Sequence, residues 1–445
     1  NSMKTLLLVL LSWVLWHSVT AQTLGRRAFV GLIVSETGSQ LSVDSVLPHS
    51  MGEKAGLHKK DLIQTINNVS IHSVKKYQEI CNEIREQEEV VIQFVRNKST
   101  REVRIMAIPY PRYSPDWAEV IYGEVAVNEC MSRTIIYKPK GVAKASGIFF
   151  IPGYNCSSIE GFSSNFNGKM IEGWVKNGYV VYTVEKSGMG DSRNCKACID
   201  VDLQTDIQLF EKAYHHFAQL NCIDSNQLYI WGHSMGGIIA PLIVSGKPVS
   251  GIMVFGTVFR PWSEFLLEMH RVQKPLLESL SFEQTEDFIR LIQKIYFEFF
   301  VLKKSPAQLF QNPEYRALVE TELEYKNGKE EMWGRHWRFW QQLDSINLAK
   351  AWQNVNCHVL VLHGNADFIQ CSSVEPYLIC EAVNSKHPGN ASLVTIQGLD
   401  HLIMNSKSYP EAVKNMNEKA YLKGNFNRDL LNETVKWLQT RIGKR

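Results

Sequence analysis

Three residues whose side chains could together cleave an acyl bond are Ser234, Asp367 and His401, in that order along the chain. A serine hydroxyl is a weak nucleophile, so an imidazole must take its proton and a carboxylate must hold that imidazole in the correct tautomer. The order predicts that Ser234 attacks a carbonyl carbon, that His401 serves as general base and then general acid, and that Asp367 orients the imidazole.

The segment around Ser234 predicts a sharp turn from a strand into a helix. Residues 228–231 are apolar and read as a buried strand, and Gly-His-Ser-Met-Gly follows at residues 232–236 before a stretch of small and apolar residues. Glycines are needed at both ends of the motif because side chains in so tight a turn would collide with neighbouring elements. The helix N-terminus that follows favours negative charge developing near Ser234.

Asp367 and His401 each follow a predicted buried strand, at residues 358–363 and 392–396. Asp400 is an alternative acid, but neighbouring residues in an extended segment point to opposite sides, which favours Asp367 as the partner of His401.

Two further histidines lie near these residues. His233 adjoins the nucleophile and is expected to pack or hydrogen-bond within the turn, and His363 precedes the acid and is expected to face the core.

A tetrahedral intermediate needs N–H donors aimed at its oxyanion. The backbone of Met235, directly after the nucleophile, is expected to supply one donor. The other is expected from the loop after an earlier strand, where Gly153 lets the backbone turn and Tyr154 offers its N–H. Asn155 is the alternative donor, and Gly153 could also be no more than a turn glycine.

The elements that would position these residues begin near Trp117, where apolar strands start to alternate with amphipathic helices. This alternation predicts a mainly parallel sheet covered on both faces, because strands buried on both sides read as continuous apolar runs. An antiparallel hairpin over residues 120–127 and 133–138 is expected to open the domain. The predicted parallel strands cover residues 147–151, 179–184, 228–231, 251–255, 358–363 and 392–396.

Several of these motifs together resemble the α/β-hydrolase superfamily over most of residues 117–445. They are Gly153-Tyr154, the Ser-Gly-Met-Gly-Asp-Ser loop at 187–192, Gly-His-Ser-Met-Gly-Gly at 232–237, Gly-Asn-Ala-Asp at 364–367 and Leu-Asp-His at 399–401. The Gly-His-Ser-Met-Gly-Gly form is similar to the branch that includes monoglyceride lipases, serine aminopeptidases and many carboxylesterases. The resemblance implies an α/β-hydrolase fold and leaves the substrate open.

About a hundred residues separate the predicted strands at 251–255 and 358–363, far more than a crossover requires. This insertion, taken as residues 260–350, is expected to form a helical cap, with helices at 262–272, 282–300 and 313–325. Its many tryptophan and phenylalanine residues favour an apolar or aromatic substrate, although about half of them are expected to form the cap's own core.

A smaller α+β module is predicted at residues 26–108, joined to the catalytic domain by a Pro-rich linker at 109–116. Its stretch Pro-His-Ser-Met-Gly-Glu-Lys-Ala-Gly-Leu-His-Lys-Lys-Asp-Leu-Ile, at 48–63, resembles the PDZ domain, although Lys60 stands where that family has glycine. The resemblance implies that a peptide or protein C-terminus adds to a strand edge. The residues implied to bind it are Phe29, Val30, Gly31 and Leu32 around the carboxylate, with Tyr77 and Ile80 along the groove. Alternatively, the module only packs on the catalytic domain or partly covers the entrance of its active site.

The remaining composition limits the function classes. With 48 basic and 45 acidic residues the net charge is +3 and no run of five like charges occurs, so a nucleic-acid partner is not expected. No metal, nucleotide or flavin motif is present, so no cofactor is expected. The CxxC at Cys195 and Cys198 favours disulfides or loop cysteines over zinc, because a second pair at matching spacing is missing.

Residues 1–21 read as a secretory signal peptide, with cleavage expected after Ala21 and residues 1–2 as an expression scar. Export to the periplasm or the extracellular space is therefore expected. The apolar stretch at 6–16 is too short to span a bilayer, so no stable membrane anchor is expected.

These observations predict an exported serine hydrolase that cleaves a carboxylic ester or related acyl bond. One alternative is a serine peptidase to which the PDZ-like module guides peptides, with Glu264, Glu268 and Arg271 as candidates for holding a substrate terminus. Another alternative is a non-enzymatic peptide-binding protein.

Overall fold

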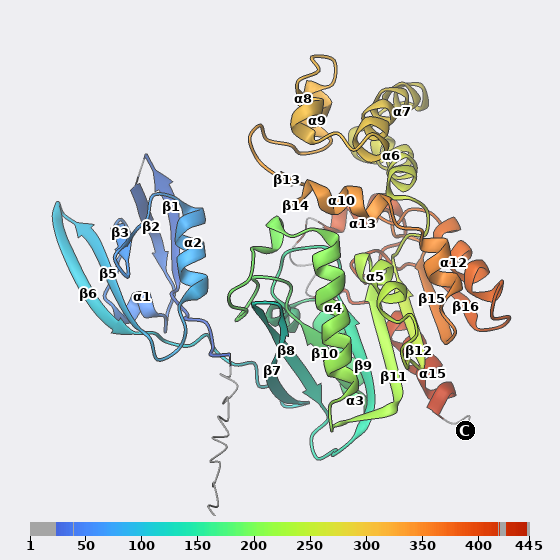
Figure 1. The fold of residues 1–445 in the computed structure, drawn as a ribbon, viewed down its shortest axis with the longest axis horizontal. Coiled ribbons are helices and arrows are strands. Elements are labelled where there is room, and N and C mark those ends of the chain that lie inside the picture. The colour runs from blue at the N-terminus through green and yellow to red at the C-terminus, as the bar shows by residue number, and fades with distance from the viewer. Residues whose placement is uncertain (1–23, 39, 417, 419–423, 443–445) are drawn as a thin grey trace, which may run out of the picture.

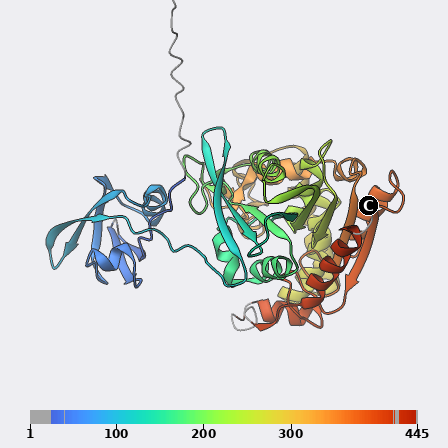
Figure 2. The ribbon, with the colours of Figure 1, turned by 90° about the horizontal axis from the view of Figure 1, so that it is seen from below.

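The computed structural model describes residues 24–442 except 39, 417 and 419–423. Two lobes are visible in Figures 1 and 2: a small sheet-and-helix module, and a larger domain built on a twisted sheet with helices on both faces and a helical cap at one end. The predicted signal peptide at 1–21 lies outside the described residues. Within the described ranges, no helix combines the length and the apolar character needed to cross a bilayer.

The N-terminal module is an antiparallel sheet with strand order β1-β2-β3-β5-β6, and the short strand β4 pairs with β3. Its core is formed by alternate apolar residues of the strands, such as Val90, Ile92 and Phe94. The elements are β1 (Leu32–Thr37), β2 (Gln40–Val46), α1 (Met51–Lys54), β3 (Leu62–Ile66), β4 (Val69–Ser70), α2 (Val74–Glu83), β5 (Glu89–Arg96) and β6 (Ser99–Met106).

Helix α2 begins where the Ser73 side chain accepts a hydrogen bond from the Lys76 N–H, which satisfies one free donor of the first turn. Lys60 adopts a φ of +73°, in the left-handed region that glycine enters most easily. This conformation explains why the PDZ family has glycine there, and lysine at this position is expected to cost some stability.

The larger domain contains an eight-stranded sheet with the order β16-β15-β12-β11-β9-β10-β8-β7. Strands β7 and β8 form an antiparallel hairpin, β8 pairs antiparallel with β10, and the remaining neighbours are parallel. The strands are β7 (Glu119–Val127), β8 (Cys130–Lys138), β9 (Ala145–Ile151), β10 (Val180–Val184), β11 (Ile223–His233), β12 (Gly251–Phe255), β15 (His358–Gly364) and β16 (Ala391–Ile396). The parallel sheet expected from the apolar runs is present.

Both faces of this sheet are buried because successive side chains of its strands enter two different cores. Phe149 and Ile151 pack with helices of one face, whereas Ile148 and Phe150 pack with those of the other. The first face carries α4 (Leu203–Ala218), α5 (Met235–Ile243) and α12 (Val374–Asn384), and the second carries α3 (Phe166–Lys176) and α15 (Arg428–Ile442). The short segments η1 (Ile159–Ser164), η2 (Cys198–Asp200), α11 (Leu348–Gln353) and α13 (Tyr409–Met416) lie in the connections.

The cap lies between β12 and α11 and differs in detail from the predicted helices. Helix α6 continues to Glu278, and only a short helix forms where residues 313–325 were expected to be one. The cap elements are α6 (Trp262–Glu278), α7 (Phe282–Tyr296), η3 (Phe297–Val301), α8 (Pro306–Phe310), α9 (Arg316–Thr321), β13 (Glu331–Met332), β14 (Arg335–His336) and α10 (Trp337–Asp344). Ser281 and Gln284 form a capping box at the start of α7, which fixes where that helix begins.

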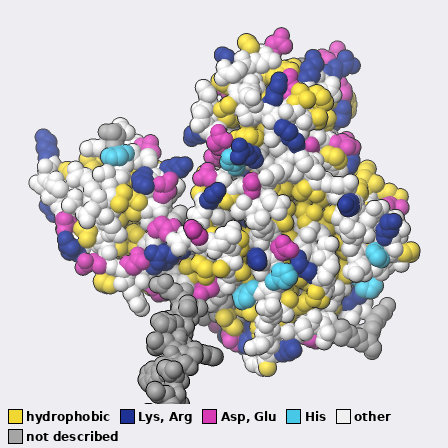
Figure 3. Space-filling view, viewed as in Figure 1, with side chains coloured by type: hydrophobic (Ala, Val, Ile, Leu, Met, Phe, Trp, Pro, Cys, Tyr) yellow, Lys and Arg dark blue, Asp and Glu magenta, His cyan; other side chains and the backbone are white. Residues whose placement is uncertain are grey.

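The module meets the larger domain through a buried ionic cluster around Asp191. The Asp191 carboxylate is fully buried and accepts from the guanidinium groups of Arg26 and, at 2.9 Å, Arg133, while its other oxygen accepts from the Arg27 N–H at 2.8 Å. Arg85 donates to the carbonyl oxygen of Ser192 at 2.8 Å. Charged side chains of both signs also gather along the seam between the lobes in Figure 3.

Two disulfides join segments of the larger domain. Cys130 is bonded to Cys195, and Cys156 is bonded to Cys198. The CxxC pair therefore does not bridge to itself, and each of its cysteines reaches a different strand or loop.

Candidate active site

Ser234 lies in the turn between β11 and α5, in a backbone conformation that few residues other than glycine adopt. Its φ is 54° and its ψ is −121°. The chain can turn this tightly only because its flanking residues lack side chains: a Cβ on Gly236 would lie 2.1 Å from the Ile151 carbonyl oxygen, and one on Gly232 would lie 2.6 Å from the Gly236 oxygen. Such strained turns concentrate at functional sites, where surrounding structure enforces them.

His401 and Asp367 are directly hydrogen-bonded, with 2.8 Å between Nδ1 of the imidazole and Oδ2 of the carboxylate. The other carboxylate oxygen accepts from the backbone N–H groups of Ile369 at 3.0 Å and Gln370 at 2.8 Å. Burial alone would raise the pKa of Asp367, but the imidazole and these donors hold that pKa below its ordinary value. The carboxylate is therefore ionised and fixed, as required to orient an imidazole and to stabilise its protonated form.

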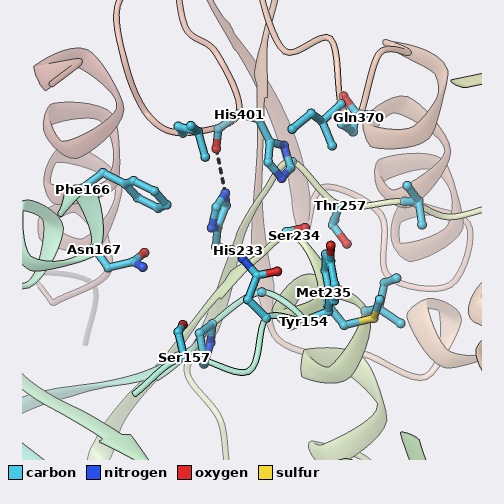
Figure 4. A pocket seen from close by; sticks show the side chains of 18 of the residues that line it. Tyr154, Ser157, Phe166, Asn167, His233, Ser234, Met235, Thr257, Gln370 and His401 are labelled. Carbon is cyan, nitrogen blue, oxygen red and sulfur yellow. Dashed lines mark hydrogen bonds between the residues drawn. The ribbon is translucent and has the colours of Figure 1, made fainter. Parts of the chain in front are cut away.

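Ser234 and His401 line one cavity of about 280 Å³. Figure 4 shows the imidazole of His401 directed toward Ser234, with Met235 and Tyr154 on the opposite side of the nucleophile. The structure thus brings Ser234, His401, Met235 and Tyr154 to one cavity, with Asp367 buried behind the imidazole. The other wall residues are Pro152, Gly153, Asn155, Ser157, Phe166, Asn167, His233, Ile238, Gly256, Thr257, Val258, Trp262, Phe265, Ile369, Gln370 and Leu402.

Two further polar residues of this region contact the segment that carries His401. His233 is hydrogen-bonded through Nε2 to the His401 carbonyl oxygen at 3.0 Å, and burial lowers the pKa of His233 to about 3, so its ring is neutral. Asp400 accepts from the Met404 N–H at 2.8 Å and from the Ser406 hydroxyl at 2.9 Å, which shapes the loop that carries His401.

His363 and Gln370 form a support that the sequence did not predict. Nδ1 of His363 lies 3.0 Å from Oε1 of Gln370, and the backbone N–H of Gln370 donates to the carboxylate of Asp367 at 2.8 Å. The buried His363 side chain thus contacts the loop that follows Asp367. Proximity in sequence to Asp367 was the only signal available for Gln370.

The residues expected to bind a peptide surround β1 and α2 of the N-terminal module. Gly31 has a φ of +65°, the Phe29 N–H donates to the Ile108 carbonyl oxygen at 2.7 Å, and the Tyr77 hydroxyl donates to the Leu32 carbonyl oxygen at 3.3 Å. Val30 is buried and Ile80 half-buried. The Phe29 amide is thus already paired. Val30, Gly31 and Leu32 stay a prediction for the carboxylate site, and Tyr77 and Ile80 stay a prediction for the groove.

A second cavity of about 410 Å³ lies under the cap. It shares Tyr154, Trp262, Phe265 and Ile369 with the first cavity, so the two adjoin. Trp262 stacks on Trp340 with ring centroids 5.5 Å apart. Aromatic residues of the cap therefore line the space into which a substrate would extend, and Trp340, only 2% exposed, also belongs to the cap's core.

Comparisons with known proteins place these features in a wider context. A family model described as "Serine aminopeptidase, S33" matches residues 160–408, and one described as "PDZ domain" matches residues 19–95. No curated protein matches the chain.

Several solved structures are similar to the chain. One is Est1E from Butyrivibrio proteoclasticus with bound ferulic acid, at 14% identity and a TM-score of 0.46, covering 72% of this chain and 99% of that chain. A soluble variant of monoglyceride lipase from Saccharomyces cerevisiae has 16% identity and a TM-score of 0.44, covering 75% of this chain and 99% of that chain. The esterase Pf2001 from Pyrococcus furiosus has 13% identity and a TM-score of 0.45, covering 74% of this chain and 96% of that chain.

Proposed function

The chain belongs to the S33 serine aminopeptidase family of α/β-hydrolases, and we propose that it is an exported serine hydrolase that cleaves a carboxylic ester or a related acyl bond. One observation carries the proposal. Ser234, in its strained turn, lines the same cavity as His401, and the far nitrogen of that imidazole is bonded to the buried carboxylate of Asp367. This is the arrangement that activates a serine hydroxyl.

In the first half of the reaction, Ser234 Oγ attacks the substrate's carbonyl carbon while Nε2 of His401 takes the hydroxyl proton. The carbonyl oxygen becomes an oxyanion, for which the N–H groups of Met235 and Tyr154 are the donors at hand. Collapse of this intermediate breaks the ester C–O bond. The leaving alkoxide takes the proton from His401, and the acyl group stays on Ser234.

In the second half, His401 takes a proton from a water molecule, and the resulting hydroxide attacks the acyl carbon. The second oxyanion collapses, the bond to Ser234 Oγ breaks, and His401 returns its proton to that oxygen. The carboxylic acid leaves, and the three side chains are restored. Throughout, Asp367 remains ionised and stabilises the imidazolium.

The apolar walls of the cavity favour a substrate whose acyl or alcohol group is apolar. Phe166, Ile238, Val258 and Phe265 line it beside the nucleophile, and the cap's tryptophans continue the apolar surface into the second cavity. Burial of apolar substrate surface there would contribute roughly 25 cal/mol per Å². We therefore favour a substrate with an apolar or aromatic group.

Peptide cleavage is the second candidate, favoured by the PDZ domain beside the catalytic domain. Against it, the residues considered for holding a peptide terminus lie elsewhere. Arg271 pairs with Glu286 at 2.9 Å on the cap surface, Glu264 pairs with Arg260 at 3.4 Å, and none of the three candidates lines either cavity. A binding protein without catalysis is the third candidate, and the intact hydrogen bond between Asp367 and His401 argues against it.

Export is supported by the two disulfides, Cys130–Cys195 and Cys156–Cys198. Disulfides persist in oxidising compartments such as the periplasm or the extracellular space, and are rare where thiols are kept reduced.

A fluorophosphonate probe and a panel of p-nitrophenyl esters beside aminoacyl-nitroanilides test the proposal. We expect the wild type to be labelled and to hydrolyse the esters, and Ser234→Ala to lose labelling and about 10⁴-fold or more in kcat. Ser99→Ala, at an exposed position of β6, is the matched control and should behave as the wild type. Activity on the amides alone would refute the esterase assignment, and an unlabelled wild type would favour the binding protein.

A further inference from the structure

Three successive backbone carbonyls in the loop that follows β9 accept hydrogen bonds from two buried basic side chains. Nζ of Lys186 donates to the carbonyl oxygen of Gly153 and, at 2.9 Å, to that of Asn155. Between them, Nη1 of Arg335 donates to the carbonyl oxygen of Tyr154 at 3.0 Å. This loop is the one from which the second oxyanion donor is expected, so its carbonyl side is held by positive charge.

Both cations are almost completely removed from water and come from different parts of the fold. Lys186 follows β10 and is 3% exposed, while Arg335 belongs to β14 of the cap and is 0% exposed. Arg335 is further fixed by Asp206 at 2.8 Å and lies over the ring of Phe339. Burying a charge costs free energy unless it is well bonded, so two buried cations on one short loop form a specific arrangement.

The geometry of the peptide group gives these contacts a consequence for the donors. In a trans peptide the C=O and the following N–H point in opposite directions. A cation that holds the Gly153 carbonyl therefore fixes the direction of the Tyr154 N–H, and one that holds the Tyr154 carbonyl fixes that of the Asn155 N–H. A charge-assisted bond to the carbonyl also polarises the peptide and strengthens its N–H as a donor.

We propose that Lys186 and Arg335 are positioning residues for the oxyanion hole, holding the carbonyls of residues 153–155 so that the N–H groups of Tyr154 and Asn155 face the reacting carbonyl. The inference rests on the proposed function. It also links the cap to the chemistry, because Arg335 connects β14 to the loop and a shift of β14 would move the donors.

The surroundings of Lys186 add a second readout. Burial lowers the pKa of Lys186 to about 7, with Asp206 and Glu185 acting to raise it and Arg335 to lower it. The ammonium form, which binds carbonyls more strongly, therefore predominates below about pH 7. In the wild type, kcat should therefore fall as the pH rises through about 7 and Lys186 loses its proton. In Lys186→Arg the side chain stays charged at all working pH values, so this fall in kcat should be absent.

The experiment measures kcat, KM and the inhibition constant of a trifluoromethyl ketone, which forms the oxyanion on the enzyme, for full-length variants on one ester. We expect Lys186→Met to lower kcat about 10²-fold and to raise the inhibition constant in parallel, with KM changed less than threefold. Lys186→Arg should recover most of the loss. A merely structural role would lower the thermal midpoint without this split between kcat and KM.

The matched control is Lys247→Met. Nζ of Lys247 also donates to a backbone carbonyl, that of Ile243 at 2.7 Å, outside the site, and its loss should leave kcat unchanged. Should Lys186→Met not fold, Arg335→Lys replaces it, because it keeps the charge but cannot bond Tyr154 and Asp206 together in the same geometry. The same split is expected there.

The outcomes separate this inference from the proposed function. A wild type that neither hydrolyses esters nor reacts with the fluorophosphonate overturns both. An active wild type whose folded Lys186→Met variant, or Arg335→Lys in its place, stays within threefold in kcat and in trifluoromethyl ketone inhibition overturns the positioning role alone.

Discussion

The choice of acid at the site depends on one hydrogen bond. Asp367 and Asp400 are both buried carboxylates near His401, but Asp367 bonds to Nδ1 of the imidazole and Asp400 to the loop that carries it. Burial raises the pKa of Asp400, whereas the imidazole helps to hold that of Asp367 low. The two carboxylates therefore differ in the direction of their pKa shift as well as in position.

Replacing Asp367 by asparagine should lower kcat about 10⁴-fold with little change in the thermal midpoint, because the amide keeps the volume but favours the wrong imidazole tautomer. Steady-state kinetics on an ester, with a thermal melt of the same sample, measures this. Asp400→Asn, the comparison variant, should cost no more than about tenfold because an amide oxygen can still accept from the loop. Equal losses in the two variants would contradict the assignment of Asp367.

Much of the site was predictable from the sequence because its central residues follow strands directly. Ser234, Asp367 and His401 each occur just after an apolar run, and the structure brings them together. Lys186, Arg335 and Gln370 were not predicted, since their partners are backbone groups or side chains fixed only by folding. Two charged residues, Glu185 and Lys186, directly after the apolar strand at 180–184, were the available signal.

Among the elements, strands were predicted more closely than cap helices. A strand buried on both faces needs a continuous apolar run, which the sequence shows at 251–255 and elsewhere, and β12 has those bounds. The cap helices have no such constraint, and their ends depend on local caps. The chain at 313–325 contains only the short helix α9, and Glu324 there has a φ of +52°, which no helix continues.

The disulfide between Cys156 and Cys198 joins the loop that follows β9 to η2, and Cys156 is next to Asn155, whose carbonyl accepts from Lys186. Replacing both cysteines by serine should lower the free energy of unfolding by about 2 to 4 kcal/mol and also lower kcat, because the loop loses a covalent attachment beside its donors. Denaturant unfolding and ester kinetics measure the two effects.

The Cys130–Cys195 pair provides the matched control, since it closes a loop of comparable length away from the cavity. Its removal should cost similar stability and leave kcat near that of the wild type. A loss of kcat in both double variants, or in neither, would show that the attachment of Cys156 has no specific role at the site.

At the scale of the whole molecule, the module and the catalytic domain form one assembly held at Asp191. The 187–192 loop, which the sequence analysis used only to support the superfamily resemblance, provides this carboxylate, and Arg26 and Arg133 hold it from the two sides of the seam. No sequence pattern predicted this contact, because Arg26 and Arg133 lie 165 and 58 residues from Asp191 along the chain.

Arg26→Met should destabilise the protein by about 3 kcal/mol, because it leaves the buried Asp191 carboxylate with one fewer cation. Small-angle scattering should show a larger radius of gyration as the module loosens. Arg104→Met, which removes an exposed arginine on β6, should change neither quantity. An unchanged radius and melting temperature in Arg26→Met would mean that other contacts suffice to fix the module.

The way the chain enters and leaves the module has a further consequence. Residues 24–27 reach the module along the catalytic domain, where the Leu24 N–H donates a hydrogen bond to the Glu124 carboxylate. The connector leaves the module beside these residues, and its Tyr110 N–H donates to the Arg27 carbonyl oxygen at 2.8 Å. A protease that cut the connector once, beyond residue 111, would therefore break the polypeptide without separating the module from the catalytic domain. The two fragments would co-purify as a single particle and come apart only in denaturant.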